Sequence, residues 1–245
     1  MRLRRIAMLP VLLAALAAPL RGQRAGVGYL FGAPDARLSL RAGYAHAFAR
    51  SDVFDDAIDF LTLERRSFSG PSIGGDLAIT VAPWLDVAVS ADYSASVRNS
   101  EDRGYLENGQ PIVQTTSFRR VPLTANAIVY LVSRGRSIGT LAWIPAKVVP
   151  WIGGGGGTTW YRFRQEGDFV DYRTLNIFAA KLESSGWAGA LQALGGVDIS
   201  LSPRFVVSAD ARRTWAGTKP GRDFTSYDRI DLSGVTGSLG VTIRL

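Results

Sequence analysis

Residues 234–245 read GVTGSLGVTIRL, a stretch that alternates strictly between two kinds of side chain. The apolar parity comprises Val235, Leu239, Val241, Ile243 and Leu245. The other parity carries threonine, serine, glycine and arginine. Because successive side chains of a β-strand point to opposite faces, this pattern predicts a strand with one apolar and one polar face.

The same period of two recurs along the chain. It is clear in residues 72–81, 85–97, 187–201 and 205–215, and weaker in residues 38–48, 121–132 and 149–164. Together with residues 234–245 these segments predict eight strands, most of them long enough for the ~9–11 residues of a membrane β-strand.

The connections alternate in length. Residues 83–84 and 202–204 are tight turns, whereas the long polar connections span residues 50–69, 98–115, 165–184 and 217–229. Only the link at residues 133–147 departs from this rule. Short turns at one end and long loops at the other are typical of an outer-membrane barrel with periplasmic turns.

A soluble β-sandwich also alternates, but its outer face is normally rich in lysine and glutamate. Here the polar face mixes aspartate with arginine, and the strands hold almost no lysine. The sequence therefore predicts an all-β fold, an eight-stranded antiparallel transmembrane β-barrel. Ten strands remain an alternative, in which residues 27–31 and 59–64 also pair.

Aromatic residues gather near the expected strand ends, as in the two interfacial girdles of a barrel in lipid. We expect the following to face the interfaces: Phe48, Tyr161, Phe163, Trp187 and Trp215 toward the loops, and Trp151 and Phe205 toward the turns.

The N-terminus resembles an export signal. A basic start is followed by an apolar run at residues 6–20 and by the small-x-small sequence Ala15-Leu16-Ala17, the layout of a secretory signal peptide. We expect residues 1–22 to be cleaved, residues 23–36 to form an N-terminal periplasmic segment and residues 37–245 to form the barrel in the outer membrane.

Composition excludes several classes of function. The absence of cysteine rules out a disulfide scaffold and thiol chemistry, and a single histidine rules out a histidine-rich metal site. Without the four arginines of residues 1–22 the net charge falls from +7 to +3. We therefore expect neither a nucleic-acid partner nor a cofactor.

Three segments resemble a known family: RVPLTAN at residues 120–126, VPWIGGGGG at 149–157, and GGVD with LSPR between 195 and 204. They resemble the outer-membrane β-barrel domain superfamily, which includes OmpA-like and OmpW-like eight-stranded barrels. The resemblance covers roughly residues 36–245 and implies a fold rather than an activity. Such barrels usually end in an aromatic residue that the barrel-insertion machinery reads, whereas this chain ends in Leu245.

Charged side chains on the polar faces are the candidate site. We expect a lumen charge network of Arg41, Asp76, Asp86, Asp92, Arg120, Arg162, Arg164, Asp198, Asp210, Arg212 and Arg244. An eight-stranded barrel is only just wide enough for side chains to fill it, so paired charges are expected to close it. The alternative is a small pore or proton path.

Three other features have open interpretations. His46, the only imidazole, suggests the His–Ser enzymes of the outer membrane, but its parity points outward and Ala47 and Phe48 follow it instead of serine. The glycines at residues 153–157 lack the ending of a phosphate loop and indicate curvature or close approach. Apolar residues in the loops either pack a cap, extend strands or bind a hydrophobic ligand.

The sequence thus favours a non-enzymatic outer-membrane protein with a structural or surface-interaction role. The alternative is a narrow channel or carrier for small hydrophobic molecules, and a third class is a lipid-modifying enzyme centred on His46. Expected partners are outer-membrane lipid, the insertion machinery through the C-terminal strand, and a hydrophobic molecule if the protein is a carrier.

Overall fold

The computed structural model describes residues 28–107, 109–139, 142–171 and 174–245. The expected signal peptide, residues 1–22, lies outside them, as do residues 23–27 of the expected periplasmic segment. The main strands are β1 (Ala36–Ala47), β2 (Gly70–Ala82), β3 (Leu85–Glu107), β4 (Gln110–Tyr130), β7 (Val148–Val170), β8 (Ile177–Ser200), β9 (Phe205–Thr218) and β11 (Gly234–Arg244).

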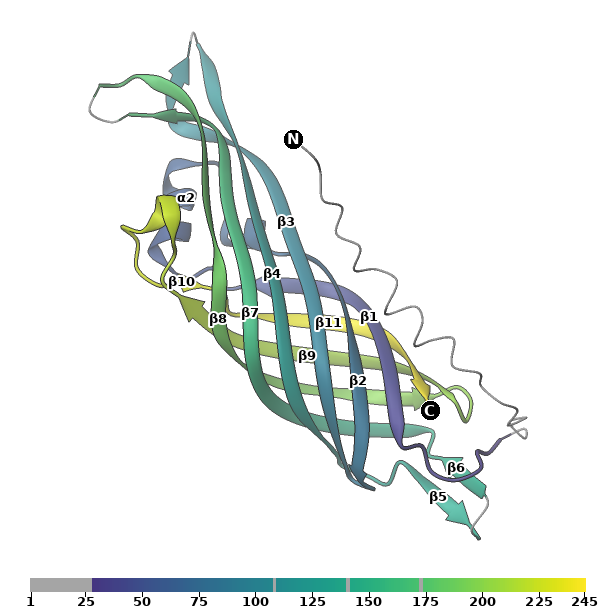
Figure 1. Cartoon of the computed structure of the whole chain (residues 1–245). Coiled ribbons are helices and arrows are strands. Elements are labelled where there is room, and N and C mark those ends of the chain that lie inside the picture. The colour runs from purple at the N-terminus through teal and green to yellow at the C-terminus, as the bar shows by residue number, and fades with distance from the viewer. Residues whose placement is uncertain (1–27, 108, 140–141, 172–173) are drawn as a thin grey trace, which may run out of the picture.

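These strands close into a ring (Figure 1). Each pairs antiparallel with its neighbours in the order β1, β2, β3, β4, β7, β8, β9, β11, and β11 returns to β1 with Leu40 opposite Val241. Within the described ranges the ring has eight strands, which confirms the predicted barrel. The period of two explains the closed barrel, because each strand then has one apolar face for the outside of the wall and one polar face for the lumen.

The ten-strand alternative is wrong. Leu30 pairs with Trp143 rather than with residues 59–64. Asp59 and Phe60 belong to the helix α2 (Asp52–Phe60), and Leu61 forms a bridge with Asp102. Val27 lies outside the described residues.

Two of the expected loops are largely strand. Residues 98–107 continue β3 and residues 110–115 begin β4, while 165–170 and 177–184 belong to β7 and β8. These four strands therefore project beyond β1, β2, β9 and β11 as an extended sheet (Figure 1). Their polar composition suits a sheet that has left the membrane.

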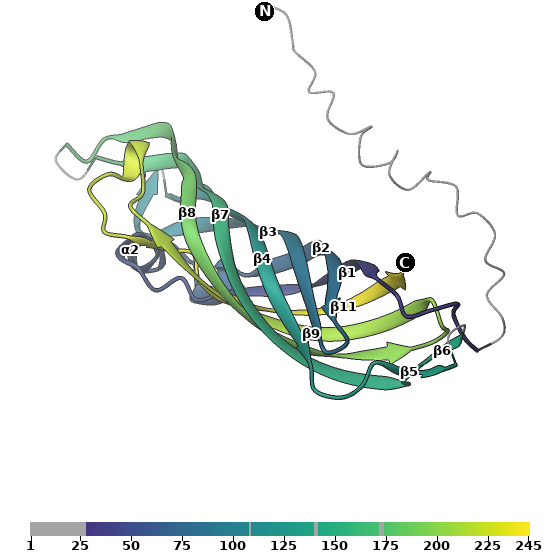
Figure 2. The same ribbon diagram turned by 60° about the horizontal axis from the view of Figure 1, so that its bottom comes forward.

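The opposite end of the barrel carries the irregular link at residues 133–147. It forms a hairpin of β5 (Gly135–Ile138) and β6 (Ala142–Pro145), visible beside the C-terminal end of β11 in Figure 2. Trp143 from this hairpin is buried, and Leu30 exchanges backbone hydrogen bonds with it. The hairpin therefore ties the segment before β1 to the turn end of the barrel.

An apolar band surrounds the outer wall. Exposed apolar side chains come from every strand of the ring: Leu40, Leu77, Val89, Leu123, Ile152, Leu191, Phe205 and Leu239. The inward faces hold polar residues such as Ser90, Asn126 and Gln192, all of which are buried. Among the helices that the structure describes, none has the length and apolar character to cross a membrane.

The girdle prediction is correct for some aromatic residues and wrong for others. Trp187, Trp215 and Phe205 are exposed on the outer wall. Tyr161, Phe163 and Trp151 are instead buried inside the barrel. Tyr161 and Phe163 pack into the apolar cluster at the loop end of the lumen, and the Trp151 indole donates to Asp198, so these rings are held inside the wall.

Candidate functional site: the filled lumen

Two guanidinium groups converge on one carboxylate at mid-height in the lumen. Arg212 makes two contacts with Asp76, Nη2 to Oδ2 at 2.9 Å and Nη1 to Oδ1 at 3.2 Å. Arg41 on β1 donates to the same carboxylate from the neighbouring strand. All three side chains are at least nine-tenths buried. Such charges are stable only in close pairs, because burial removes their hydration.

The same layer contains two further carboxylates. Asp92 accepts hydrogen bonds from Nη2 and Nε of Arg41 at 2.6 and 3.1 Å. Asp210 accepts one from Nε of Arg212 at 2.9 Å and one from the Ser238 hydroxyl at 2.9 Å. Arg41 and Arg212 thus serve three carboxylates, and we call Arg41, Asp76, Asp92, Asp210 and Arg212 the middle layer.

A second layer lies toward the turns. Asp86, with no exposed side-chain surface, accepts from Nε of Arg37 and Nη1 of Arg134, both at 2.9 Å. Arg37 also donates to Asp198 at 2.8 Å. We call Arg37, Asp86, Arg134 and Asp198 the turn-side layer.

Aromatic groups complete the turn-side layer. The Tyr130 hydroxyl donates to Asp86 at 2.7 Å, and the Trp151 indole donates to Asp198 at 2.9 Å. The guanidinium of Arg134 stacks 4.7 Å from the Tyr130 ring centroid, a cation–π contact. Each carboxylate therefore has more than one donor, which offsets its desolvation.

Two predicted network members are buried without a carboxylate contact among the described residues. Arg244 donates to the Ser200 hydroxyl at 2.8 Å and to the Pro203 carbonyl at 3.2 Å. Arg120 donates to the carbonyls of Leu232 and Ser233 at 3.1 and 3.2 Å. Both arginines therefore lie in the lumen as expected, but neither forms the expected ion pair within the described ranges.

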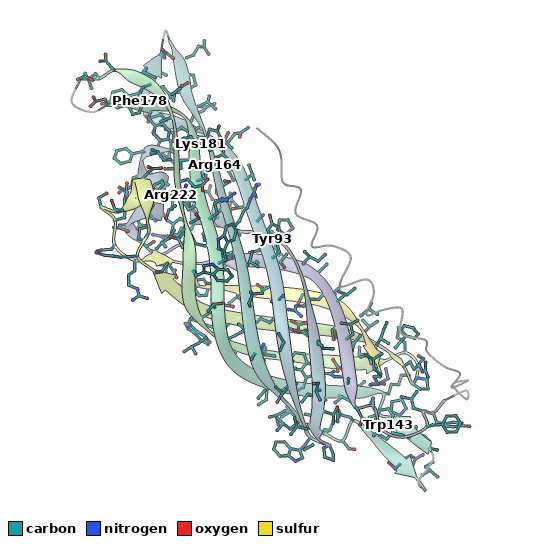
Figure 3. All side chains as sticks on the ribbon, in the orientation of Figure 1. Tyr93, Trp143, Arg164, Phe178, Lys181 and Arg222 are labelled. Carbon is teal, nitrogen blue, oxygen red and sulfur yellow. The ribbon has the colours of Figure 1, made fainter. Side chains whose placement is uncertain are left out.

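Arg162 and Arg164 are not in the lumen. They share the outward parity of β7, whereas Tyr161, Phe163 and Gln165 between and beside them are buried. Figure 3 shows Arg164 on the upper part of the barrel, near Lys181 and Arg222. At this height the usual pattern is reversed. Polar side chains face outward because water surrounds the wall, and apolar side chains face inward because an apolar plug fills the lumen.

The sequence interpretation missed two arginines of the turn-side layer. Arg37 has the parity of Arg41, so extending the first strand by one residue would have found it. Arg134 enters from the irregular link, where no periodicity indicates its direction. Both residues form ion pairs with Asp86.

An apolar plug closes the loop end of the lumen. The Phe54 ring of α2 is fully buried, and its centroid lies 4.7, 5.2 and 5.4 Å from those of Phe68, Phe118 and Phe163 in edge-on geometry. Phe224, from the connection between β9 and β11, packs on Phe163 at 5.3 Å. The apolar residues of the first loop thus pack a cap.

The other apolar loop segment extends strands. Phe169 and Phe178 face each other near the ends of β7 and β8, with centroids 6.2 Å apart. Figure 3 places Phe178 at the far tip of the projecting sheet.

The glycine run permits close packing between strands. A Cβ at Gly155 would lie 1.9 Å from the carbonyl oxygen of Ala125, and one at Gly157 would lie 2.1 Å from that of Leu123. Only glycine fits at such distances. The geometry therefore agrees with the structural interpretation of residues 153–157.

His46 contacts a serine that the sequence did not place beside it. Its Nδ1 lies 3.1 Å from the Ser69 hydroxyl, which also accepts the Ala47 N–H at 3.1 Å. His46 is exposed, but Ser69 is only 1% exposed. A nucleophile needs access to its substrate, and this hydroxyl is instead part of the packing between β1 and β2.

The spaces between these groups are small. Three interior cavities have volumes of about 30, 10 and 20 Å³, and each has room for one or two waters. The two charged layers and the apolar plug can therefore fill the lumen and exclude solutes.

Neither protein-family models nor curated protein sequences match this chain. Solved structures of outer-membrane proteins are similar to it, among them three that are each similar over most of both chains. Outer membrane protein OprG from Pseudomonas aeruginosa is 14% identical, covering 88% of this chain and 99% of its own, with a TM-score of 0.45. Neisserial surface protein A is 14% identical, covering 86% and 96%, with a TM-score of 0.44. A major outer membrane protein from Thermus thermophilus is 12% identical, covering 86% and 99%, with a TM-score of 0.45. At TM-scores below 0.5, the fold assignment for this chain rests on its own closed strand ring.

Proposed function

We propose that this protein is a closed, non-enzymatic outer-membrane barrel with a structural or surface-interaction role. The observation that carries the proposal is the filling of the lumen at three heights, by the turn-side layer, the middle layer and the Phe54 plug. Opening a water-filled path would have to separate buried ion pairs and expose aromatic surface, and both changes are unfavourable.

The outer wall supports a membrane location. Its exposed apolar band would promote aggregation in water, whereas in lipid it is the expected surface of a barrel. Trp187 and Trp215 stand at the loop side of this band and suit the interface with headgroups. Strand β11 carries the Val241-x-Ile243-x-Leu245 pattern on its outer face, and we propose that the insertion machinery reads it there.

The projecting sheet of β3, β4, β7 and β8 supports a surface role. It extends the barrel on the side away from the turns, where such proteins face the exterior. A purely membrane-filling barrel would not need these extensions.

The carrier and enzyme alternatives receive less support. The interior cavities are too small for a hydrophobic solute, and the Ser69 hydroxyl beside His46 is buried. Replacing His46 by alanine is expected to leave the lipid A profile of the producing cells unchanged.

Solute flux through reconstituted vesicles tests the proposal. Liposomes containing the purified protein should swell in arabinose no faster than protein-free liposomes and should take up a small hydrophobic dye at the protein-free rate. Faster arabinose entry would support the channel, and faster entry of the dye alone would support the carrier.

A further inference from the structure

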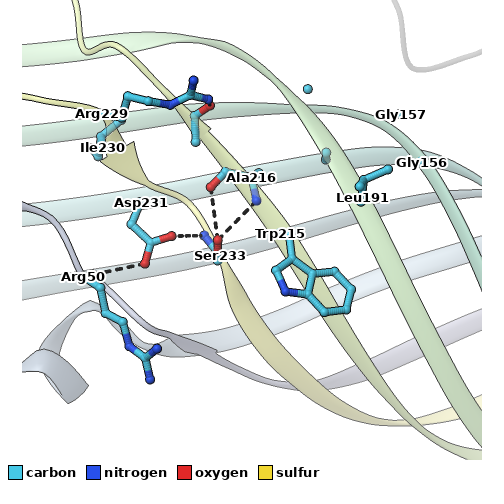
Figure 4. A pocket seen from close by; sticks show the side chains of 13 residues that line it. Arg50, Gly156, Gly157, Leu191, Trp215, Ala216, Arg229, Ile230, Asp231 and Ser233 are labelled. Atoms are coloured by element: carbon cyan, nitrogen blue, oxygen red, sulfur yellow. Dashed lines mark hydrogen bonds between the residues drawn. The ribbon is translucent and has the colours of Figure 1, made fainter.

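An open groove lies on the barrel wall where β8 and β9 separate. Pairing of these strands ends at Ala190 opposite Ala216, while β8 continues upward and the chain after β9 turns away into β10 (Ile230–Asp231). The groove has a volume of about 790 Å³. Figure 4 shows Leu191 and Trp215 on one side of it and Arg50 and Arg229 on the other.

The floor of this β8–β9 groove is smooth and apolar. Gly156, Gly157 and Gly189 contribute no side chains, and Leu191 and Trp215 expose apolar surface beside them. A Cβ at Gly189 would meet no atom within 4 Å, so the space above it is free. The floor continues the apolar band, so acyl chains of the surrounding lipid can reach it.

The rim of the groove carries cations. Arg50 and Arg229 line it. Arg213 lies beside this lining: its guanidinium stacks on the Trp215 ring at 4.9 Å and on the Phe48 ring at 5.1 Å, and Arg50 stacks on the same Phe48 ring at 4.9 Å. Among the described residues, no carboxylate lies within 4 Å of these three guanidinium groups. Within the part of the chain that the structure describes, Arg229 is the one of the three whose guanidinium donates a hydrogen bond, to the Gly217 carbonyl, so most of their N–H donors are free.

One acidic residue also lines the groove. Asp231 accepts the backbone N–H of Arg50 at 3.1 Å and that of Ser233 at 2.9 Å. Its carboxylate is therefore used in fixing the loop backbone rather than in neutralising the arginines. The rim retains an excess of positive charge: Arg50 and Arg229 lie on the loop side of Trp215, and Arg213 lies two residues toward the turns from it on β9.

We propose that the β8–β9 groove binds a phosphate-bearing lipid of the outer leaflet. The acyl chains lie against the glycine floor, Leu191 and Trp215, and the phosphate accepts hydrogen bonds from Arg50, Arg213 and Arg229. Guanidinium forks match phosphate oxygens in geometry and charge. The apolar floor and the cationic rim are adjacent, which matches an anionic amphiphile and not a free polar anion.

Native mass spectrometry of the folded protein in neutral detergent tests this proposal, with diphosphoryl lipid A as the probe. The triple variant Arg50→Gln, Arg213→Gln, Arg229→Gln should bind it at least tenfold more weakly. The matched control removes three arginines elsewhere, Arg66→Gln, Arg98→Gln and Arg136→Gln, and should bind like the wild type.

A second pair of variants tests the floor without changing charge. Gly189→Phe fills the groove and should also weaken binding at least tenfold, whereas Gly237→Phe, an open outward position on β11, should not. Retention of the folded band in unheated electrophoresis confirms that each variant is intact.

Three outcomes would overturn the proposal. The first is equal weakening by the triple variant and its arginine control, which would indicate a general charge effect. The second is equal affinity for fully dephosphorylated lipid A. The third is full competition by inorganic phosphate with no effect of Gly189→Phe, which would indicate a free anion site. None of these outcomes bears on whether the lumen is closed.

Discussion

Replacing Phe54 by alanine should release the plug without opening a channel. The ring is fully buried among three other aromatic rings. Removing a buried phenylalanine costs about 3–5 kcal/mol, from lost transfer free energy and the cavity left behind. The nine-residue helix α2 buries only Val53, Phe54 and Ala57, and a helix of this length is not stable alone. Phe54 is the largest of these three side chains, so its removal should weaken the docking of α2 substantially.

Limited proteolysis in proteoliposomes measures this release. Trypsin should cut Phe54→Ala at Arg50, Arg65 or Arg66, which flank α2, at least tenfold faster than it cuts the wild type. Phe60→Ala, on the same helix but with a half-exposed side chain, is the matched control and should change the rate little. The barrel should keep its folded electrophoretic mobility in both variants.

Two results would refute this reasoning. Unchanged tryptic cleavage of Phe54→Ala would show that the aromatic cluster does not hold α2. Steady conductance of Phe54→Ala in planar bilayers would show that the plug alone closes the lumen, because the middle and turn-side layers below it remain intact in that variant.

Other predictions follow from the layers, the wall and the topology. Asp92→Ala should leave part of the Arg41 guanidinium unpaired and lower the free energy of unfolding by about 3–5 kcal/mol in urea titration; a loss below about 1 kcal/mol would contradict burial of the pair. Val241→Arg should cost about 2–4 kcal/mol on the lipid face, and a cysteine at Val241 but not at Thr242 should react with a bilayer-restricted label. An epitope tag between β7 and β8 should be stained on intact cells, and one beside Ser202 should not; staining of the latter would invert the orientation.

The strands could be predicted because lipid and lumen impose opposite demands on alternate residues. Leu239 and Val241 face outward and Thr242 is buried, as the parity of residues 234–245 requires. The same rule placed Arg41, Asp76 and Arg212 inside, where the structure brings them together. It also applies to Arg37, which stands one residue before the segment expected to form the first strand.

The rule that apolar residues face outward and polar residues face inward failed beyond the membrane, where lipid no longer surrounds the wall. Above the membrane the wall has water outside, so Arg162 and Arg164 turn outward while Tyr161 and Phe163 pack against the plug. The glycines at residues 153–157 have no side chains, so the sequence shows no alternation between apolar and polar residues in this part of the strand. Plug formation by Phe54 depends on contacts with Phe118 and Phe163, which lie far along the chain and leave no local signal.

The most direct test of the closed lumen is the conductance of the purified wild-type protein in planar lipid bilayers. Because paired charges fill two levels and aromatic side chains fill a third, insertion should give no conductance or only rare, brief openings. Protein insertion is verified in the same bilayers by recovery of folded, labelled protein. A steady, large, ohmic channel would contradict the account.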